Sequence, residues 1–251
     1  MSIETRLESL MGRLPEGMTE NVALGTGIAE GYDYFDSAIG SVVVTFTPEG
    51  VSSLDTVDGF ETRFAERFGR PLIRAKAPSA WSGRIPEAIE RGAPGELPID
   101  LSSVTDFQAE VLTTTATIPK GEVRPYGWVA KEVHRPKAVR AVGSAVARNP
   151  IPLIIPCHRV VRTDGHIGNY SLGGPHNKVE LLTHEGAAPE WLEELASHRV
   201  RVRGNTSTGI FCHPTCAAIR RSKPSNVVDF HSGSDATEAG FRPCKVCRPV
   251  T

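Results

Sequence analysis

The chain has 251 residues, of which 39% are hydrophobic and 23% are charged, as is ordinary for a globular protein. This length predicts two or three domains. No apolar run approaches the roughly 20 residues that span a bilayer, and the charged N-terminal stretch MSIETRLESLMGRL is unlike a secretory signal. We therefore expect a cytoplasmic protein with no membrane partner.

The net charge of −1 conceals an uneven distribution along the chain. Residues 118–187 hold 10 Lys and Arg against 5 Asp and Glu, and residues 199–251 hold 9 against 3, so the remainder carries −12. Basic segments are typical of proteins that bind a polyanion such as nucleic acid. On charge alone, an ordinary solvated surface remains an equal alternative.

The first residues predict a polar lead-in followed by a β-hairpin. Residues 1–35 are polar and favour helix. The run GSVVVTF at 40–46, the turn PEG and the apolar residues 51–54 then indicate two paired strands.

A short amphipathic helix should follow the hairpin. In FETRFAERF, residues 60–68, phenylalanine recurs every four residues, and Gly69 is placed as a C-cap. Pro, Gly and Ala then become frequent between residues 77 and 98, which we interpret as a linker to a second unit.

The second unit opens with the capping box Thr105-x-x-Gln108. The turn-rich loop IPKGEVRPYGW covers residues 118–128. A short helix around 129–133 and another that begins at Pro136 are separated by a turn, which predicts helix-turn-helix geometry.

The second of these helices carries small side chains on one face, Ala141, Ser144 and Ala145, which would let its backbone approach a groove closely. Asn149 and Pro150 end the helix. Residues 151–155 predict a buried strand that runs directly into PCHR.

The end of this unit is predicted from turn and capping residues. Asp164 and Gly165 mark a hairpin turn, a last helix covers residues 175–185, and Gly186 caps it. Residues 190–204 are a charged connector.

Cys157 is an unusual residue to find beside an apolar run. The ordinary interpretation is an inert, buried thiol. Against it, Pro156 places the sulfur at a turn, His158 could accept the thiol proton directly or through water, and Arg159 adds positive potential that favours the thiolate. Nucleophilic cysteines are built in this way.

The central region resembles the methylated-DNA–protein-cysteine S-methyltransferases, which repair O6-alkylguanine in DNA. The similarity rests on ordered motifs over residues 103–187: FQ, IPKGEV, PYG, RAVGSAVARNP, IPCHRVV, DGHIGNYSLGG and LLTHEG. It reaches back weakly over residues 37–100, where that family has a ribonuclease-H-like domain. The family fold also implies a winged-helix-type domain around the helix-turn-helix.

The resemblance implies roles for the residues at the matching positions. Cys157 is the methyl acceptor, His158 takes its proton through a water, and Glu185 orients the imidazole. Tyr126 assists the departing guanine, and Asn149 braces the turn that holds the cysteine.

The resemblance also implies DNA contacts and a base pocket. Arg140 fills the gap left by the flipped nucleotide, beside Ala141 and Ser144. The pocket is lined by Val160, Tyr170 and Ser171. Trp128 departs from the family, which commonly has a small acidic residue there. Because a methyl thioether is not hydrolysed, one protein repairs one lesion without a soluble cofactor.

The other four cysteines form two close pairs, Cys212-x3-Cys216 and Cys244-x2-Cys247. With no secretory signal, this spacing indicates a structural Zn²⁺ site with four cysteine ligands, one ion per chain. Such an ion would supply much of the folding energy of a segment too short for a large apolar core.

The surrounding sequence, TGIFCHPTC, RRSKPSNVVDF and AGFRPCKVC, resembles the zinc domain of Ada proteins. That resemblance implies a second methyl acceptor, Cys212, for methylphosphotriesters, with a structural or DNA-anchoring module as the alternative. Phosphate contacts are expected from Arg220, Arg221, Lys223, Arg242 and Lys245. The module here follows the guanine-repair region instead of preceding it, which argues against a transcriptional role.

Together these observations predict a monomeric α+β multidomain protein. It comprises an acidic, ribonuclease-H-like domain with a lead-in helix (1–100), an alkyltransferase domain (101–188), a connector (189–203) and a zinc module (204–251). The expected partner is double-stranded DNA that contains alkylated guanine. A damage sensor or transcriptional regulator, and a lesion-binding recruiter, are the alternatives.

Overall fold

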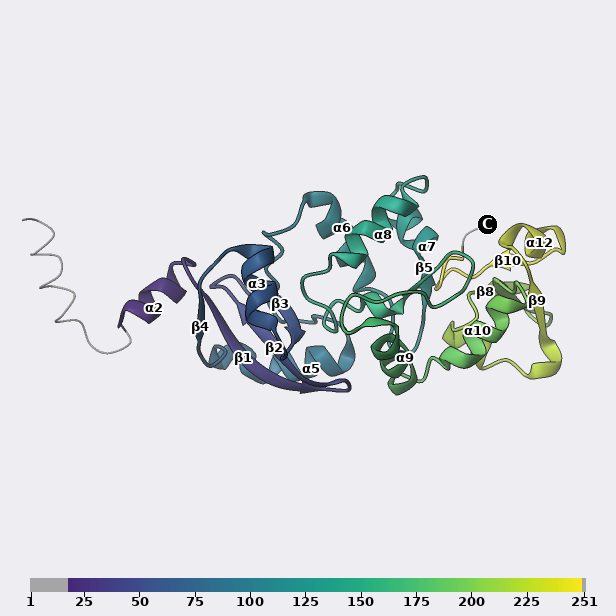
Figure 1. The fold of residues 1–251 in the computed structure, drawn as a ribbon. Coiled ribbons are helices and arrows are strands. Elements are labelled where there is room, and N and C mark those ends of the chain that lie inside the picture. The colour runs from purple at the N-terminus through teal and green to yellow at the C-terminus, as the bar shows by residue number, and fades with distance from the viewer. Residues whose placement is uncertain (1–17, 250–251) are drawn as a thin grey trace, which may run out of the picture.

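A computed structural model of the chain describes residues 18–249. Three parts follow one another along the molecule: an N-terminal sheet with helices, a mainly helical central part, and a small C-terminal sheet (Figure 1). The protein is of the α+β class. Within residues 18–249, no helix is both long and apolar enough to cross a membrane.

The N-terminal sheet has the strand order β3-β2-β1-β4 and follows a short helix, α2. The β1–β2 and β2–β3 pairs are antiparallel, and β4 runs parallel to β1. The expected hairpin is confirmed as β2 and β3, whereas the lead-in also contains β1, which the sequence did not predict. The bounds are α2 Met18–Gly25, β1 Glu30–Ser37, β2 Gly40–Phe46, β3 Val51–Thr56 and β4 Leu72–Arg74.

The phenylalanine-rich helix forms as expected. Helix α3 spans Phe60–Phe68 with Phe60 and Phe64 buried, and Gly69 ends it in the left-handed conformation at φ 62°. Of the predicted lead-in, residues 1–35, the first 17 lie outside the described residues.

The prediction of a linker between residues 77 and 98 is wrong. This segment contains α4 (Ser79–Ser82) and α5 (Arg84–Arg91). Ile85 and Ala88, three residues apart on α5, are 0% and 3% exposed and belong to the main core. A high Pro, Gly and Ala content therefore accompanies packed helices here, because small residues allow close approach.

The central part contains the predicted helices with shifted starts. The capping box at Thr105 is confirmed. The helix expected from Pro136 begins only at Val139, because residues 135–138 form a preceding turn in which the Ala138 N–H bonds the Arg135 carbonyl. The elements are α6 Asp106–Thr115, β5 Arg124–Pro125, α7 Tyr126–Glu132, α8 Val139–Ala147, η1 Cys157–Arg159, β6 Val160–Val161 and α9 Gly174–His184.

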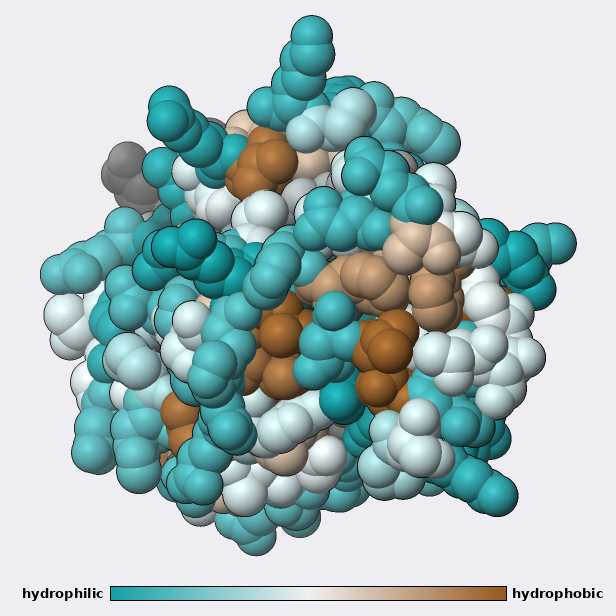
Figure 2. Space-filling model, turned by 90° about the vertical axis from the view of Figure 1, so that its right-hand side faces the viewer, coloured by the Kyte–Doolittle hydropathy of each residue, from teal (hydrophilic) through white to brown (hydrophobic). Residues whose placement is uncertain are grey.

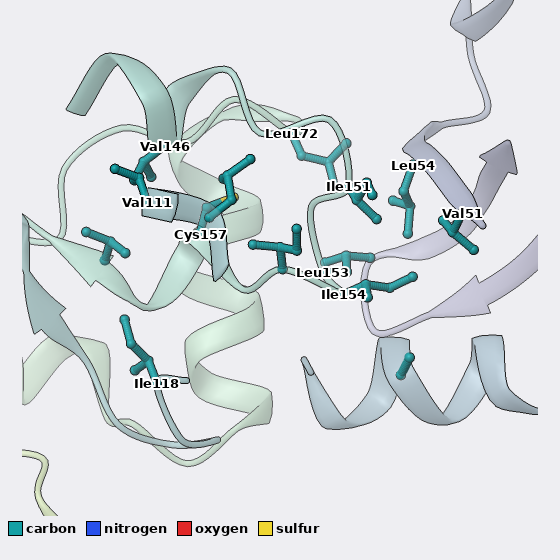
Figure 3. Packing of buried hydrophobic residues seen from close by; sticks show 14 of the residues in the cluster. Val51, Leu54, Val111, Ile118, Val146, Ile151, Leu153, Ile154, Cys157 and Leu172 are labelled. Carbon is teal, nitrogen blue, oxygen red and sulfur yellow. The ribbon is translucent and has the colours of Figure 1, made fainter. Parts of the chain in front are cut away.

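Residues 151–155 form consecutive turns, so the predicted strand is wrong. The Ile155 N–H bonds the Ile151 carbonyl at 2.9 Å, and Leu153 has a φ of +70°. The apolar side chains are nevertheless buried: Figure 3 shows Ile151 facing Leu54 of the N-terminal sheet, with Cys157 beyond on the helical side. This segment joins the two parts of one continuous core.

The predicted turn at Asp164–Gly165 is present, closed by hydrogen bonds between residues 162 and 166. The predicted charged connector, residues 190–204, has regular secondary structure, because it contains most of α10 and the first residues of β7. The C-terminal sheet has the order β10-β8-β7-β9. The elements are α10 Pro189–Ser197, β7 Val202–Asn205, β8 Ile210–Cys212, α11 Ala217–Arg220, η2 Pro224–Asn226, β9 Val227–Phe230, α12 Gly233–Glu238 and β10 Arg242–Pro243.

Candidate active site and cysteine cluster

Cys157 is the first residue of the 3-10 turn η1 and is only 4% exposed. It belongs to the same buried apolar cluster as Val142 and Val146 of α8 (Figure 3). Burial raises the pKa of the Cys157 thiol, because an apolar surrounding disfavours the thiolate. The hydrogen bond from Asn149 and the charge of Lys178 oppose that rise. The resting sulfur is therefore a protonated thiol.

Asn149 holds the turn that carries the cysteine. It is 3% exposed, and its amide nitrogen donates to the Ile155 carbonyl (2.8 Å) and to the Cys157 sulfur (3.2 Å). Its carbonyl oxygen accepts from the Ile151 N–H at 3.0 Å. The Asn149 side chain thus provides hydrogen bonds to backbone groups of residues 151 and 155, which a neighbouring strand would otherwise have provided.

His158 and Glu185 are in direct contact, with 3.0 Å between Nε2 and Oε1. Burial lowers the pKa of His158 more than Glu185 raises it, so the ring is neutral at pH 7. His158 Nδ1 is buried and has no hydrogen-bond partner among the described residues. A neutral imidazole anchored through one nitrogen can accept a proton on the other.

Glu185 remains ionised although it is largely buried. Desolvation acts to raise its pKa, but hydrogen bonds from His158 and Arg159 outweigh it and lower the pKa to about 2. The Arg159 guanidinium binds both carboxylate oxygens, Nε to Oε2 at 2.9 Å and an Nη to Oε1 at 2.7 Å. A bidentate pair of this kind fixes the orientation of the carboxylate.

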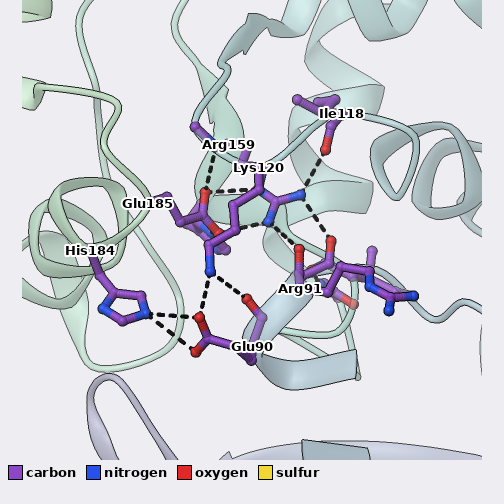
Figure 4. Close-up of polar contacts among 12 residues, drawn as sticks. Glu90, Arg91, Ile118, Lys120, Arg159, His184 and Glu185 are labelled. Carbon is purple, nitrogen blue, oxygen red and sulfur yellow. Dashed lines mark hydrogen bonds and ion pairs between the residues drawn. The ribbon is translucent and has the colours of Figure 1, made fainter. Parts of the chain in front are cut away.

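Arg159 is held by a carboxylate and by backbone groups, and its predicted effect on the thiol stays a prediction. Besides Glu185, its guanidinium donates to the backbone carbonyls of Arg91, Gly92 and Ile118 at 2.7–2.9 Å (Figure 4). Gly92 has a φ of +60°, and a Cβ there would lie 2.1 Å from an Arg159 nitrogen. The arginine therefore ties the N-terminal part to the carboxylate.

The cation that influences the thiol is Lys178, which sequence reasoning missed. Lys178 is 1% exposed, and its ammonium donates at 2.7 Å to the carbonyls of Val160 and Ile167. Burial lowers its pKa to about 8, and a Cys157 thiolate would raise it. Lys178 precedes the buried residues Leu181 and Leu182 by three and four positions, which places all three on the inner face of α9. This helical spacing is the sequence pattern from which its burial could have been predicted.

The residues predicted for the base pocket differ in exposure. Tyr170 and Val160 are buried, and the Tyr170 ring stands edge-on to His158 with centroids 6.1 Å apart. Ser171 is exposed. Tyr126 is half-buried at the start of α7, and burial followed by the Cys157 charge raises the pKa of its hydroxyl.

Helix α8 presents an exposed face next to this site. Arg140, Ala141 and Ser144 are all exposed, whereas Val142, Ala145 and Val146 are buried. The contact of α8 with α7 supports the predicted pairing of two short helices.

The four remaining cysteines form one cluster. The sulfurs of Cys212, Cys216, Cys244 and Cys247 lie within 4.8 Å of one another, and all four residues are buried. None of the cysteines forms a disulfide. Four converging thiols fit a tetrahedral Zn²⁺ ion and explain how so small a sheet is held together. We call residues 202–249 the cysteine module.

Part of the cysteine cluster borders a surface hollow. Cys212 and Cys244 line a hollow whose walls include Ile210 and Val246. The Cys247 sulfur instead accepts the His213 N–H at 3.4 Å. Figure 2 looks onto this end of the molecule, where apolar side chains gather among hydrophilic ones. The predicted phosphate contacts Arg220, Arg221, Lys223, Arg242 and Lys245 are all exposed.

Two family models match the chain. The model described as 6-O-methylguanine DNA methyltransferase, DNA binding domain, matches residues 106–187, and the model described as the metal binding domain of Ada matches residues 196–250. The first range contains the buried cysteine with its histidine and carboxylate. The second contains the cysteine cluster.

A curated relative agrees with the first match. A methylated-DNA–protein-cysteine methyltransferase of Methanosarcina acetivorans is 32% identical over 166 residues, which is 62% of this chain and 98% of the relative. The chain belongs to the methylated-DNA–protein-cysteine methyltransferase family.

Other relatives are matched over less of their length. The bifunctional transcriptional activator/DNA repair enzyme Ada of Escherichia coli is 34% identical over 172 residues, or 66% of this chain and 48% of Ada. The Shigella flexneri methyltransferase is 49% identical over 82 residues, which is 33% of this chain and 47% of that protein. The chain thus spans about half the length of these two relatives.

Solved structures show the same fold for the first two parts. The Mycobacterium tuberculosis OGT in complex with DNA has a TM-score of 0.51 and 32% identity, and the similarity covers 65% of this chain and 99% of that one. The M. tuberculosis O6-methylguanine methyltransferase has a TM-score of 0.50 and 33% identity, over 63% of this chain and 93% of that one.

Proposed function

We propose that the protein repairs DNA by stoichiometric transfer of the methyl group of O6-methylguanine to Cys157. The observation that carries this proposal is the buried set Asn149–Cys157–His158–Glu185 beside the exposed face of α8. A protonated thiol next to a neutral, carboxylate-anchored imidazole is the arrangement that such a displacement needs.

The transfer step balances without a cofactor. His158 Nδ1 takes the thiol proton through a water, the sulfur attacks the methyl carbon, and an S–CH₃ bond forms as the bond from carbon to guanine O6 breaks. Tyr126 donates a hydrogen bond to the guanine as it leaves or gives it a proton. When the proton is transferred, the base departs neutral, and the proton held by His158 restores the Tyr126 hydroxyl through the solvent. The product thioether is not hydrolysed, so each chain acts once.

The DNA contacts follow from the exposed side of α7 and α8. We assign these helices as the helix-turn-helix of a winged-helix-type domain, with α8 in the groove. Ala141 and Ser144 permit close approach, and Arg140 occupies the space of the extruded nucleotide. Val160, Tyr170 and Ser171 then line the pocket for the base, and Asn149 braces the turn that holds Cys157.

Cys212 is the second acceptor in this proposal and takes methyl from methylphosphotriesters. Support comes from its place on the hollow at the cluster, with the exposed Arg242 and Lys245 on the same rim. When bound, Zn²⁺ would keep all four cysteines as thiolates. Arg220, Arg221 and Lys223 would add phosphate contacts.

The proposal divides the chain as the sequence suggested. It has an N-terminal domain of ribonuclease-H-like topology (1–100), an alkyltransferase domain (101–188), a connector (189–203) and the zinc module (204–251). The protein acts as a monomer on alkylated double-stranded DNA.

The test is mass spectrometry of tryptic peptides after exposure to a duplex that carries both lesions. We expect a mass increase of one methyl group on the Cys157 peptide and on the Cys212 peptide. Cys157→Ala should abolish base repair and leave the Cys212 signal. Binding of the duplex by wild type without any methylated peptide would instead indicate a lesion-binding protein, and methyl on Cys157 alone would reduce the cysteine module to a scaffold or DNA anchor.

A further inference from the structure

One loop, residues 121–125, lies between the guanine-repair site and the cysteine module. On the repair side, the Gly121 N–H donates to Glu185 Oε2 at 3.4 Å. Gly121 has a φ of +74°, and a Cβ there would lie 2.7 Å from the Glu185 carbonyl oxygen, so the loop is seated against that residue. Its last residues, β5, pair with β6 directly after the PCHR turn, and Tyr126 follows at once.

On the other side, the same loop is held by residues that flank a cluster cysteine. The Thr215 hydroxyl accepts from the Val123 N–H at 2.9 Å and donates to the Val123 carbonyl at 3.4 Å. The Ala217 N–H donates to Glu122 Oε1 at 2.9 Å. Thr215 and Ala217 are the sequence neighbours of Cys216. A displacement of Cys216 would therefore be transmitted to the loop through the hydrogen bonds of these two residues.

A buried ion pair stiffens the loop. Glu122 and Arg124, 5% and 2% exposed, form a salt bridge, and the Arg124 guanidinium lies 5.6 Å from the Trp128 ring centroid. Trp128 is the departure from the family noted in the sequence. Arg248 of the cysteine module lies 5.9 Å from the same ring and pairs with Glu132 of α7 at 2.6 Å. The unusual tryptophan thus belongs to the contact between the two parts.

Apolar packing beside the loop is incomplete. A cavity of about 230 Å³ opens there, and its walls include Val123, Leu192 and His213. Because apolar side chains do not fill this space, the hydrogen bonds of Thr215 and Ala217 contribute more to the position of the loop on this side.

We propose that the cysteine module is a positioning element of the guanine-repair site, with Thr215 as the positioning residue. Thr215 holds the 121–125 loop, the loop seats Glu185 and the start of α7, and these in turn align His158 and Tyr126. This inference rests on the proposed function, and it makes base repair at Cys157 depend on an intact cysteine cluster.

The test compares Thr215→Val with Thr215→Ser in the full chain. Valine keeps the shape but leaves the Val123 N–H without a partner, whereas serine keeps the hydroxyl. We expect Thr215→Val to slow methyl transfer from O6-methylguanine at saturating DNA about tenfold, with DNA affinity and zinc content unchanged. Thr215→Ser should remain within about twofold of wild type. Equal rates for the valine variant and wild type would overturn the proposal.

A second readout needs no DNA lesion. The rate at which iodoacetamide alkylates Cys157, followed on its tryptic peptide across pH 6–10, should fall at pH 7 in Thr215→Val and keep its wild-type profile in Thr215→Ser. Amide exchange in residues 121–126 should accelerate only in the valine variant. If the wild-type protein transfers no methyl group, the proposed function is wrong. The pH dependence of Cys157 alkylation still decides in that case whether Thr215 positions the site.

If the Thr215→Val variant does not bind zinc, the Arg220→Ala variant provides an independent test of the contact between the cysteine module and the repair site. Arg220 is exposed on α11 and donates to the Gly186 carbonyl, next to Glu185, at 3.5 Å. Its removal should lower the alkylation rate of Cys157 about threefold. An unchanged rate in this variant would contradict the proposal in the same way.

Discussion

The Glu185 carboxylate should contribute strongly to stability at neutral pH. A carboxyl whose pKa falls from its ordinary 4.5 to about 2 on folding contributes about 3 kcal/mol to the free energy of unfolding. The sign follows from the direction of the shift: the contribution is complete above pH 4.5 and is lost as the pH falls towards 2. Glu185→Gln removes it and also leaves the buried Arg159 without its counter-ion, so a loss of 3 kcal/mol or more is expected at pH 7.

Urea unfolding of wild type and Glu185→Gln at pH 7, 5 and 3 measures this difference. Glu180→Gln is the matched control, because Glu180 lies exposed on the same helix and its nearest partner, His176, is 3.9 Å away. The difference in free energy of unfolding between wild type and Glu185→Gln should become smaller as the pH falls. Loss of the metal in acid lowers the stability of both proteins equally and so does not change this difference. A gap below 1 kcal/mol at pH 7, or one that stays constant with pH, would refute the assigned ion pair.

Three further outcomes are expected. Lys178→Met removes the cation that opposes the burial of the Cys157 thiol, so the pKa from a pH series of iodoacetamide alkylation should rise; an unchanged value would show that the ammonium does not act on the sulfur. Ile85→Ala should cost about 3 kcal/mol in urea unfolding, because Ile85 is fully buried, whereas Ile28→Ala, at a 66% exposed position, should cost less than 0.5. Affinity for duplex DNA should fall steeply between 50 and 200 mM salt, and a flat salt dependence would contradict phosphate contacts by the basic residues.

Local patterns in the sequence were sufficient for several elements. The hairpin, the phenylalanine-rich helix and the capping box at Thr105 each depend on residues close together in the chain, and each is present. Residues 151–155 have the same apolar character as a strand, but their backbone is bent by the Asn149 side chain. Composition alone does not reveal such a tertiary contact.

The residues of the candidate active site were easier to predict from the sequence than the contacts that they make with one another. Sequence adjacency suggested that Arg159 acts on the thiol, yet a 3-10 turn has three residues per turn and directs Cys157, His158 and Arg159 to three different sides. The sulfur, the imidazole and the guanidinium therefore meet different partners. Lys178 was accessible from its helical spacing to Leu181 and Leu182, whereas the link from Thr215 to Val123 joins residues 92 positions apart and leaves no pattern in the sequence.

The contacts of Arg159 limit how the chain can be shortened. Two of its carbonyl acceptors belong to Arg91 and Gly92, at the end of α5, and a third backbone link to the N-terminal part is the bond from the Leu54 N–H to the Pro150 carbonyl. A truncated fragment that starts at residue 101 would keep every side chain assigned to chemistry. It would also leave a guanidinium buried in the protein without two of its five acceptor atoms, so the minimal autonomous unit extends well upstream of the reactive sulfur.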